Sequence, residues 1–150
     1  ACPLRRPCIA YRDGRQASLP NLAKARAATP RAFQAFVIER NNRFLVRQRP
    51  PDVVNSGLWE FPNIELPRRN QRIPEAGGGF QPLCTIKHSI TRYRITLDAF
   101  IGQATPRRKP ATDETWLTTA ELEELAFTSA HRKILKKLIA LKAKPPRINA

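Results

Sequence analysis

The sequence predicts an α/β (α+β) domain, in which a mixed, mostly antiparallel sheet carries helices packed against it. Apolar and aromatic runs of strand length occupy 32–38, 44–46, 57–62 and 93–101, with Asn, Gly or Pro between them. Residues 118–141 instead repeat apolar side chains at helical spacing. The chain has 150 residues, 41% of them hydrophobic, which suits one domain with its own core.

Segment 57–62, Gly-Leu-Trp-Glu-Phe-Pro, is predicted to be a core strand around which the sheet assembles. Alternation along a strand would place Trp59 and Phe61 on one face and Glu60 on the other. Two aromatic side chains on one face can begin a core. Pro62 lacks a backbone N–H, so it is expected to end the strand.

Two strands joined by a turn are predicted before this segment from the composition of residues 32–46. Residues 32–38 are almost wholly apolar, which indicates a strand covered on both faces. Arg-Asn-Asn-Arg at 40–43 predicts a hairpin turn, because Asn tolerates positive φ. Residues 44–46 return as the second strand, and 50–56 form a loop that leads to Gly57.

The C-terminal part predicts a strand followed by two helices. Residues 114–117 form the strand, with Trp116 covering the core. Thr118 and Glu121 have capping-box spacing for a helix that extends through Leu125. A second helix runs from about Ser129 to Leu141, and residues 143–150 form a frayed tail. The predicted buried stripe of this second helix is Ile134, Leu135, Leu138 and Leu141. Its outward face carries Arg132, Lys133, Lys136 and Lys137.

The charge is strongly one-sided, with 27 Lys and Arg against 12 Asp and Glu, a formal net charge of +15. Such an excess indicates a polyanionic partner, and nucleic acid is favoured over a membrane because no amphipathic anchor carries the charge. No apolar run approaches the roughly 20 residues of a membrane span. Residues 11–31 are a basic connector that either lies along phosphates or is a plain linker; 106–110 is an exposed basic loop.

The three cysteines leave alternatives open. Cys2 and Cys8 could supply two thiolates to one metal centre, but zinc and iron–sulfur clusters each need four ligands. A disulfide or two free thiols is the other interpretation. Cys84 has apolar neighbours and is predicted to be a buried core thiol. His88 and His131 have no further His or Cys at metal spacing, so no metal is assigned to them.

Polar hydrogen-bond donors crowd the start of the strand that contains Tyr93 and Ile95. The segment begins with Lys87, His88, Ser89, Ile90, Thr91 and Arg92 and continues to Arg94. Short hydroxyls beside cations suit contact with phosphates and base edges. The alternative is an edge strand whose polar side chains face water.

The hairpin with a basic exit (Arg47, Arg49), the short loop and Gly-Leu-Trp-Glu-Phe-Pro together resemble the start of a Nudix-type domain. Catalytic members follow it with a Glu-rich helix that binds Mg²⁺, a cation that needs several carboxylate oxygens. Here Glu65 and Glu75 are the acids between Glu60 and Asp98, and the stretch 66–72 is basic. The resemblance therefore implies a Nudix-like sheet flanked by helices, with the catalytic helix degenerate or missing.

A non-catalytic Nudix-like domain after Cys-x5-Cys resembles the C-terminal part of MutY-type adenine DNA glycosylases. By that resemblance, residues 1–10 end the [4Fe–4S] loop of an N-terminal catalytic domain, with Cys2 and Cys8 as ligands in the full-length parent. Residues 11–31 are then the interdomain connector, and 32–142 the Nudix-like domain. No cofactor is expected in this chain alone.

The family segment His-x-Phe-Ser-His, which meets 8-oxoguanine, aligns on His88. Ile90, Thr91 and Arg92 then stand at the Phe, Ser and second His positions. The resemblance implies lesion contact by His88, Ser89, Ile90, Thr91 and Arg92, and makes Arg47, Arg49, Lys87 and Arg94 candidate phosphate contacts.

The expected function is recognition of 8-oxoguanine opposite adenine in base excision repair, with no catalytic residue in this chain. The expected partners are double-stranded DNA and the catalytic domain of the parent, for a monomer in the bacterial cytoplasm at the nucleoid, without a membrane. The alternatives are a stand-alone Nudix-like nucleotide hydrolase and a protein-interaction module.

Overall fold

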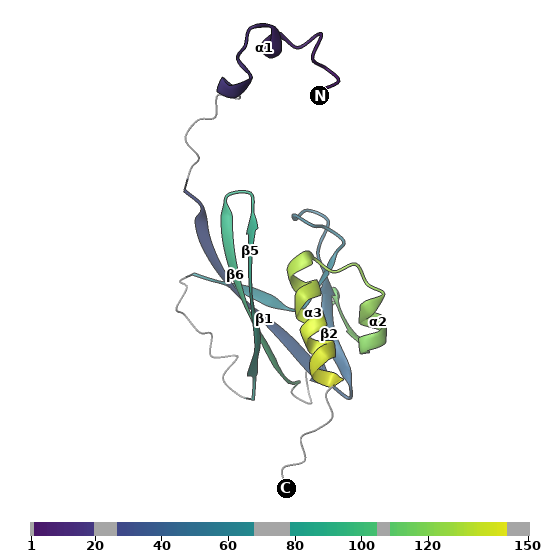
Figure 1. Cartoon of the computed structure of the whole chain (residues 1–150). Helices are drawn as coiled ribbons and strands as arrows, with labels where there is room; N and C mark the ends of the chain where they lie inside the picture. Colours follow the sequence, from purple (N-terminus) through teal and green to yellow (C-terminus); the bar gives the residue numbers. More distant parts are fainter. Residues whose placement is uncertain (1, 20–26, 68–78, 105–108, 144–150) are drawn as a thin grey trace.

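The computed structural model describes residues 2–19, 27–67, 79–104 and 109–143 (Figure 1). The strands are β1 (Thr29–Arg40), β2 (Arg43–Gln48), β3 (Trp59–Glu60), β4 (Asn63–Leu66), β5 (Gln81–Ile90), β6 (Tyr93–Gln103) and β7 (Glu114–Leu117). The helices are α1 (Ile9–Arg12), the short 3-10 turn η1 (Gln16–Ser18), α2 (Thr119–Glu123) and α3 (Ser129–Lys142).

The described strands form one sheet, in the order β3-β2-β1-β6-β5. β4 pairs with the first half of β1, and β7 pairs with β2. β1 and β6 run parallel over almost their whole length, whereas the other described pairs are antiparallel. The α2 and α3 helices lie on one face of this sheet (Figure 1). This arrangement confirms the predicted mixed, mostly antiparallel α+β fold.

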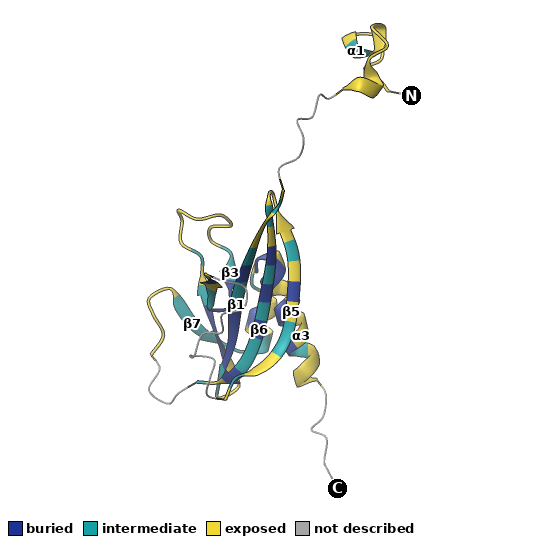
Figure 2. Ribbon diagram, turned by 90° about the vertical axis from the view of Figure 1, so that its left-hand side faces the viewer, coloured by how far each residue is buried: buried dark blue, intermediate teal, exposed yellow. Residues whose placement is uncertain are grey.

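Strand β1 is largely buried (Figure 2), and core clusters lie on both of its faces, as its continuous apolar sequence predicts. Ala35 and Val37 belong to the cluster that includes the buried side of α3. Phe36 and Ile38 belong to a second cluster on the opposite face. The predicted strand 32–38 is correct, and β1 extends it in both directions.

Two local predictions are confirmed by backbone geometry. Asn41 and Asn42 have φ values of 51° and 58° in the turn between β1 and β2. The Thr118 side chain accepts from the Glu121 N–H, while the Glu121 carboxylate accepts from the Thr118 N–H at 2.8 Å. Both features depend on residues close in sequence, which is why the sequence predicts them.

Helix α3 agrees with the prediction except at its last apolar position. Ile134, Leu135 and Leu138 are buried, but Leu141 is 46% exposed because the helix ends at Lys142, beyond the edge of the core. Ala130 and His131 complete the buried stripe. None of the described helices is long and apolar enough to cross a membrane.

The 57–62 segment differs from the prediction. Strand β3 covers Trp59 and Glu60 alone rather than the whole segment, and Glu60 is buried, with 3% of its surface exposed. β3 lies between β2 and the segment that leads into α3. On the α3 side, the Trp59 N–H donates to the Ala126 carbonyl, and the Thr128 N–H donates to the Trp59 carbonyl. Both edges of β3 are therefore hydrogen-bonded, while Phe61 is fully buried as predicted.

Several predictions fall partly or wholly outside the described residues. They concern the basic connector 11–31, the degenerate or missing catalytic helix, whose place in the chain is 62–82, the loop 106–110 and the tail 143–150. The described part of 62–82 contains β4 and the start of β5. β1 begins at Thr29, inside the predicted connector 11–31.

Candidate nucleic-acid interface

The donor-rich segment 87–95 is a β-hairpin rather than the start of one strand. It comprises the end of β5, a two-residue turn at Thr91 and Arg92, and the start of β6. The alternation of apolar and polar residues is broken before Tyr93, so the sequence pattern predicts one strand where the structure has two. Since β5 and β6 pair in register, neighbouring side chains point to opposite faces of the sheet.

The predicted contact residues are therefore divided between two surfaces. His88 pairs with Ile95, and Ile90 pairs with Tyr93, so these side chains face α3. Lys87, Ser89 and Arg94 face the opposite side. A hairpin of this kind presents two different surfaces to its surroundings.

On the helix side, the hairpin borders a cavity of about 420 Å³, here called the helix-side cavity. Its other walls come from β1, from the loop before β3 and from the first turn of α3. The lining includes Arg31, Phe33, Arg49, Val54, Asn55, Glu60, Asn63, His88, Ile90, Thr91, Tyr93, Thr128, Ser129 and His131. This mixture of apolar walls and convergent polar groups is typical of small-molecule sites.

Glu60 lies at the base of this cavity and binds two arginines. Its carboxylate accepts from Arg47 Nη2 at 2.7 Å and from Arg49 Nη1 at 2.5 Å. Burial alone would raise the pKa of Glu60, but the hydrogen bonds from Arg49 and Arg47 outweigh it and hold that pKa below its usual value. Arg47 and Arg49, predicted as phosphate contacts, thus have an internal carboxylate partner.

His131 lies beside this ion-pair group and is 5% exposed. Its Nδ1 accepts a hydrogen bond from the Phe61 N–H at 3.1 Å, so Nδ1 is unprotonated and the neutral ring carries its proton on Nε2. Burial lowers the pKa of His131 to about 4, against the opposing attraction of Glu60. The imidazole is therefore a neutral acceptor that connects α3 to the end of β3.

The turn residues project beyond the cavity. Ile90 is 38% exposed. Thr91 has a φ of 49°, which is unfavourable for a β-branched residue, and its hydroxyl donates to the Ile90 carbonyl. The Arg92 guanidinium lies over the Tyr93 ring, with its Nη2 3.0 Å from the Tyr93 hydroxyl. The turn therefore exposes an apolar side chain, a hydroxyl and a cation side by side, from Ile90, Thr91 and Arg92.

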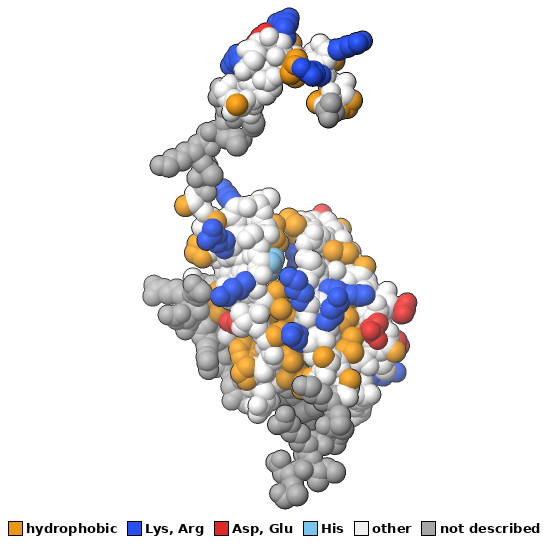
Figure 3. Space-filling model, in the orientation of Figure 1, with side chains coloured by type: hydrophobic (Ala, Val, Ile, Leu, Met, Phe, Trp, Pro, Cys, Tyr) orange, Lys and Arg blue, Asp and Glu red, His pale blue; other side chains and the backbone are white. Residues whose placement is uncertain are grey.

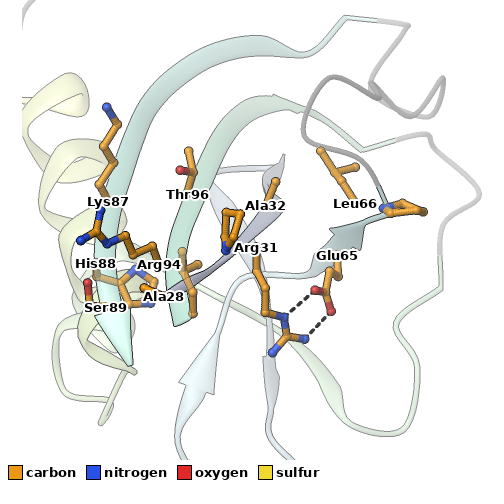
Figure 4. Close-up of a pocket in the computed structure, with 13 residues that line it drawn as sticks. Ala28, Arg31, Ala32, Glu65, Leu66, Lys87, His88, Ser89, Arg94 and Thr96 are labelled. Carbon is orange, nitrogen blue, oxygen red and sulfur yellow. Dashed lines mark hydrogen bonds and ion pairs between the residues drawn. The ribbon is translucent and has the colours of Figure 1, made fainter. Parts of the chain in front are cut away.

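On the other side of the hairpin, Lys87, Ser89 and Arg94 border an open groove of about 1070 Å³, here called the open-face groove (Figure 4). His88 reaches both surfaces, and burial followed by the charge of Lys133 lowers its pKa. Arg31 also borders both, paired with Glu65 and lying close to the Phe33 and Tyr93 rings. Arg31 was not predicted as a site residue, because its preceding Pro and basic context indicated only a connector.

The cysteines do not form a metal site among the described residues. Cys2, Cys8 and Cys84 are free thiols, and no group of three potential metal ligands is found there. Two thiolates do not fit a four-ligand cluster on their own. Cys84 packs at the margin of the core and is partly exposed, which corrects the prediction of a buried thiol; partial burial raises its pKa.

Comparison with known proteins identifies the fold. Among solved structures, the chain is similar to the E. coli ORF135 protein, at 18% identity and a TM-score of 0.62, covering 83% of this chain and 99% of that one. It is similar to the C-terminal domain of mouse MUTYH, solved in complex with human PCNA, at 20% identity and a TM-score of 0.62, covering 77% and 91%. A MutT protein from Methanosarcina mazei Go1 has 12% identity and a TM-score of 0.63, covering 80% and 100%.

No curated protein matched the chain. The structural similarities establish a shared fold, and they agree with the Nudix-like architecture predicted from the sequence. A family model described as NUDIX domain matches residues 34–137, which is more than half of the chain. The chain therefore belongs to the NUDIX domain family.

Proposed function

We propose that this chain is a non-catalytic DNA-lesion recognition domain, which helps an adenine glycosylase of the MutY type find 8-oxoguanine opposite adenine. The β5–β6 turn is the contact element. In a longer parent protein, Cys2 and Cys8 would complete a [4Fe–4S] cluster with ligands of an N-terminal catalytic domain. The parent would act as a monomer on double-stranded DNA at the bacterial nucleoid.

The geometry of the turn is the observation that carries this proposal. Thr91 holds an unfavourable positive φ at an exposed position, although Asn or Gly would adopt that conformation at lower cost. Its hydroxyl oxygen keeps acceptor capacity after donating to Ile90. Exposed Ile90 and the Arg92 guanidinium flank it. An apolar side chain, a hydroxyl and a planar cation together suit contact with a purine.

Two features of the whole chain support a DNA partner. The formal net charge is +15, which favours association with a polyanion. The order of Cys-x5-Cys, basic connector and Nudix-like domain is that of the MutY family, to which the segment starting at His88 also aligns. The MUTYH domain among the structural neighbours shares the fold at 20% identity.

Duplex-binding titrations test the proposal. We expect the chain to bind a duplex with 8-oxoguanine opposite adenine more tightly than matched duplexes with guanine opposite cytosine or adenine. Thr91→Ala and Arg92→Ala should each reduce this preference by about 2- to 10-fold, the effect of losing one hydrogen bond. Thr112→Ala and Lys136→Ala remove a similar exposed hydroxyl and cation elsewhere and should leave the preference unchanged. Equal binding of all three duplexes by the unmodified chain would refute lesion recognition.

The second candidate is a nucleotide hydrolase. The volume of the helix-side cavity suits a small ligand, and MutT-type proteins share the fold. Against this candidate, Glu60 is neutralised by two arginines, and the described residues contain no cluster of acids for a metal. Incubation with 8-oxo-dGTP or dGTP and Mg²⁺, with formation of the nucleoside monophosphate and pyrophosphate as the readout, decides between the two candidates: we expect no turnover. Turnover that is abolished by EDTA would favour the hydrolase.

A further inference from the structure

The open-face groove carries a compact set of hydrogen-bond donors that take part in none of the side-chain hydrogen bonds or ion pairs found among the described residues. Lys87 pairs with Thr96, and Ser89 pairs with Arg94, so the four side chains form a two-by-two array on one face of β5 and β6. Directly opposed residues in a sheet are about 5 Å apart, and diagonal ones about 7–8 Å. Two cations and two hydroxyls thus occupy neighbouring positions on one face of β5 and β6 (Figure 4).

The two cations of this array have no acidic partner among the described residues. Glu65, at the far side of the groove, is bound by Arg31, and Asp98, one step along β6, accepts from the Thr85 hydroxyl at 2.6 Å. Lys87 and Arg94 are exposed and make no ion pair in the described part of the chain. Two cations in diagonal positions repel each other, so a polyanion that binds both removes an unfavourable interaction.

We propose that the open-face groove is a phosphate-binding site, in which Lys87, Ser89, Arg94 and Thr96 hold the sugar-phosphate backbone of duplex DNA. This inference rests on the proposed function and assigns separate roles to the two sides of the hairpin. The turn contacts a base, and the open face holds the backbone. Arg47 and Arg49, whose guanidinium groups bind Glu60, do not line this groove.

The composition of the groove indicates backbone rather than base contact. Its described lining contains Ala28, Pro30, Ala32, Leu66, Pro67 and Ile95 besides the polar residues, and, apart from the partly buried imidazole of His88, no aromatic ring on which a base could stack. Lysine, arginine and hydroxyl side chains are the common donors to phosphate oxygens, and such contacts carry no sequence information. The groove should therefore contribute affinity without lesion preference.

The test is the salt dependence of DNA binding by the 150-residue chain. Binding constants are measured for the 8-oxoguanine:adenine duplex and the guanine:cytosine duplex between 50 and 200 mM salt. In Lys87→Ala/Arg94→Ala, the slope of log K against log salt should fall by about 2, because each lost phosphate contact removes about 0.9. Both duplexes should weaken by the same factor, so the ratio of their affinities stays constant.

The matched control is Lys136→Ala/Lys137→Ala, which removes the same charge from the exposed face of α3. Lys and Arg side chains gather around this helix, so it is a credible competing surface (Figure 3). A slope that falls equally in the control and the groove variant, or only in the control, would overturn the proposal. Lys87→Gln/Arg94→Gln, which keeps more of the side-chain bulk, is the second variant should the alanine pair unfold.

The outcomes separate this inference from the proposed function. If the unmodified chain prefers neither duplex but the groove variant loses salt slope, the phosphate site stands and lesion recognition fails. If the lesion duplex is preferred and the groove variant keeps the original slope, lesion recognition stands and the phosphate site is refuted. Absence of binding to any duplex refutes both.

Discussion

At the scale of single residues, the buried imidazole of His131 makes stability depend on pH. Its folded-state pKa of about 4 lies below the 6.5 of a free histidine, so the unfolded chain binds a proton more readily. The stabilising contribution is complete above pH 6.5 and is lost as pH falls toward 4. Denaturant titrations across that range should show unfolding free energy decreasing by about 3 kcal/mol in total.

His131→Gln provides the control for this pH dependence. The amide oxygen can accept the Phe61 N–H as Nδ1 does, but it does not titrate in this range. The variant should lose most of the change between pH 6.5 and 4. His88 also has a lowered pKa, so His88→Gln should remove a smaller part. If the unfolding free energy of His131→Gln varies with pH as steeply as that of the unmodified chain, His131 is not the source of the pH dependence.

At the scale of elements, a buried ion-pair group joins β2 to β3. Glu60 is buried while Arg47 and Arg49 are partly exposed, so Glu60→Gln would leave two cations without their carboxylate. Loss of one partner of a buried pair costs about 3–5 kcal/mol, and partial solvation of the arginines places the effect near the lower limit. Urea unfolding should show a free-energy decrease of about 3 kcal/mol.

Glu65→Gln is the matched comparison, since Glu65 pairs with Arg31 on the surface of β1 and β4. Both partners are more than a third exposed, and exposed ion pairs contribute about 0–1 kcal/mol. The midpoint of urea unfolding should therefore change little in Glu65→Gln. Equal destabilisation by the two substitutions would show that burial is not what distinguishes these ion pairs.

Elements specified by neighbouring residues could be predicted from the sequence. The Asn41–Asn42 turn, the Thr118 capping box and strand β7 depend on local chemistry or local periodicity. Strand β5 could not be separated from β6, because its exposed edge alternates poorly and Thr91 is an unusual turn residue. The parallel pairing of β1 with β6 joins segments about sixty residues apart and leaves no periodic signal.

The candidate site could be predicted in part. Ser89, Ile90, Thr91 and Arg92 lie at the exposed end of the β5–β6 hairpin, whereas His88 is partly buried. The division of this segment between two surfaces depends on the register of β5 against β6, which sequence alone does not reveal. The engagement of Arg47 and Arg49 by Glu60 was missed because it depends on β2 lying beside β3, although an acid between two core aromatics was an available signal.

At the scale of the whole molecule, positive charge is spread over separate parts of the chain. The open-face groove, the exposed side of α3 and residues 1–26 each carry cations. Residues 1–26 alone hold Arg5, Arg6, Arg12, Arg15, Lys24 and Arg26 against Asp13. Since phosphate contacts contribute separately to the salt slope, deletion of a segment should reveal its share.

Deletion of residues 1–26 is expected to leave the folded domain stable while lowering the salt slope of DNA binding. The described hydrogen bonds of residues 2–19 stay within that segment, and the sheet begins at Thr29, whose N–H donates to the Arg92 carbonyl. The thermal midpoint should therefore stay within about 2 °C of that of the full chain. For a domain of this size, such a shift is a change of less than about 1 kcal/mol in the free energy of unfolding. Lesion preference should persist, since the turn is retained. A fall of many degrees would instead assign the N-terminal segment a structural role, and an unchanged slope would make it a plain linker.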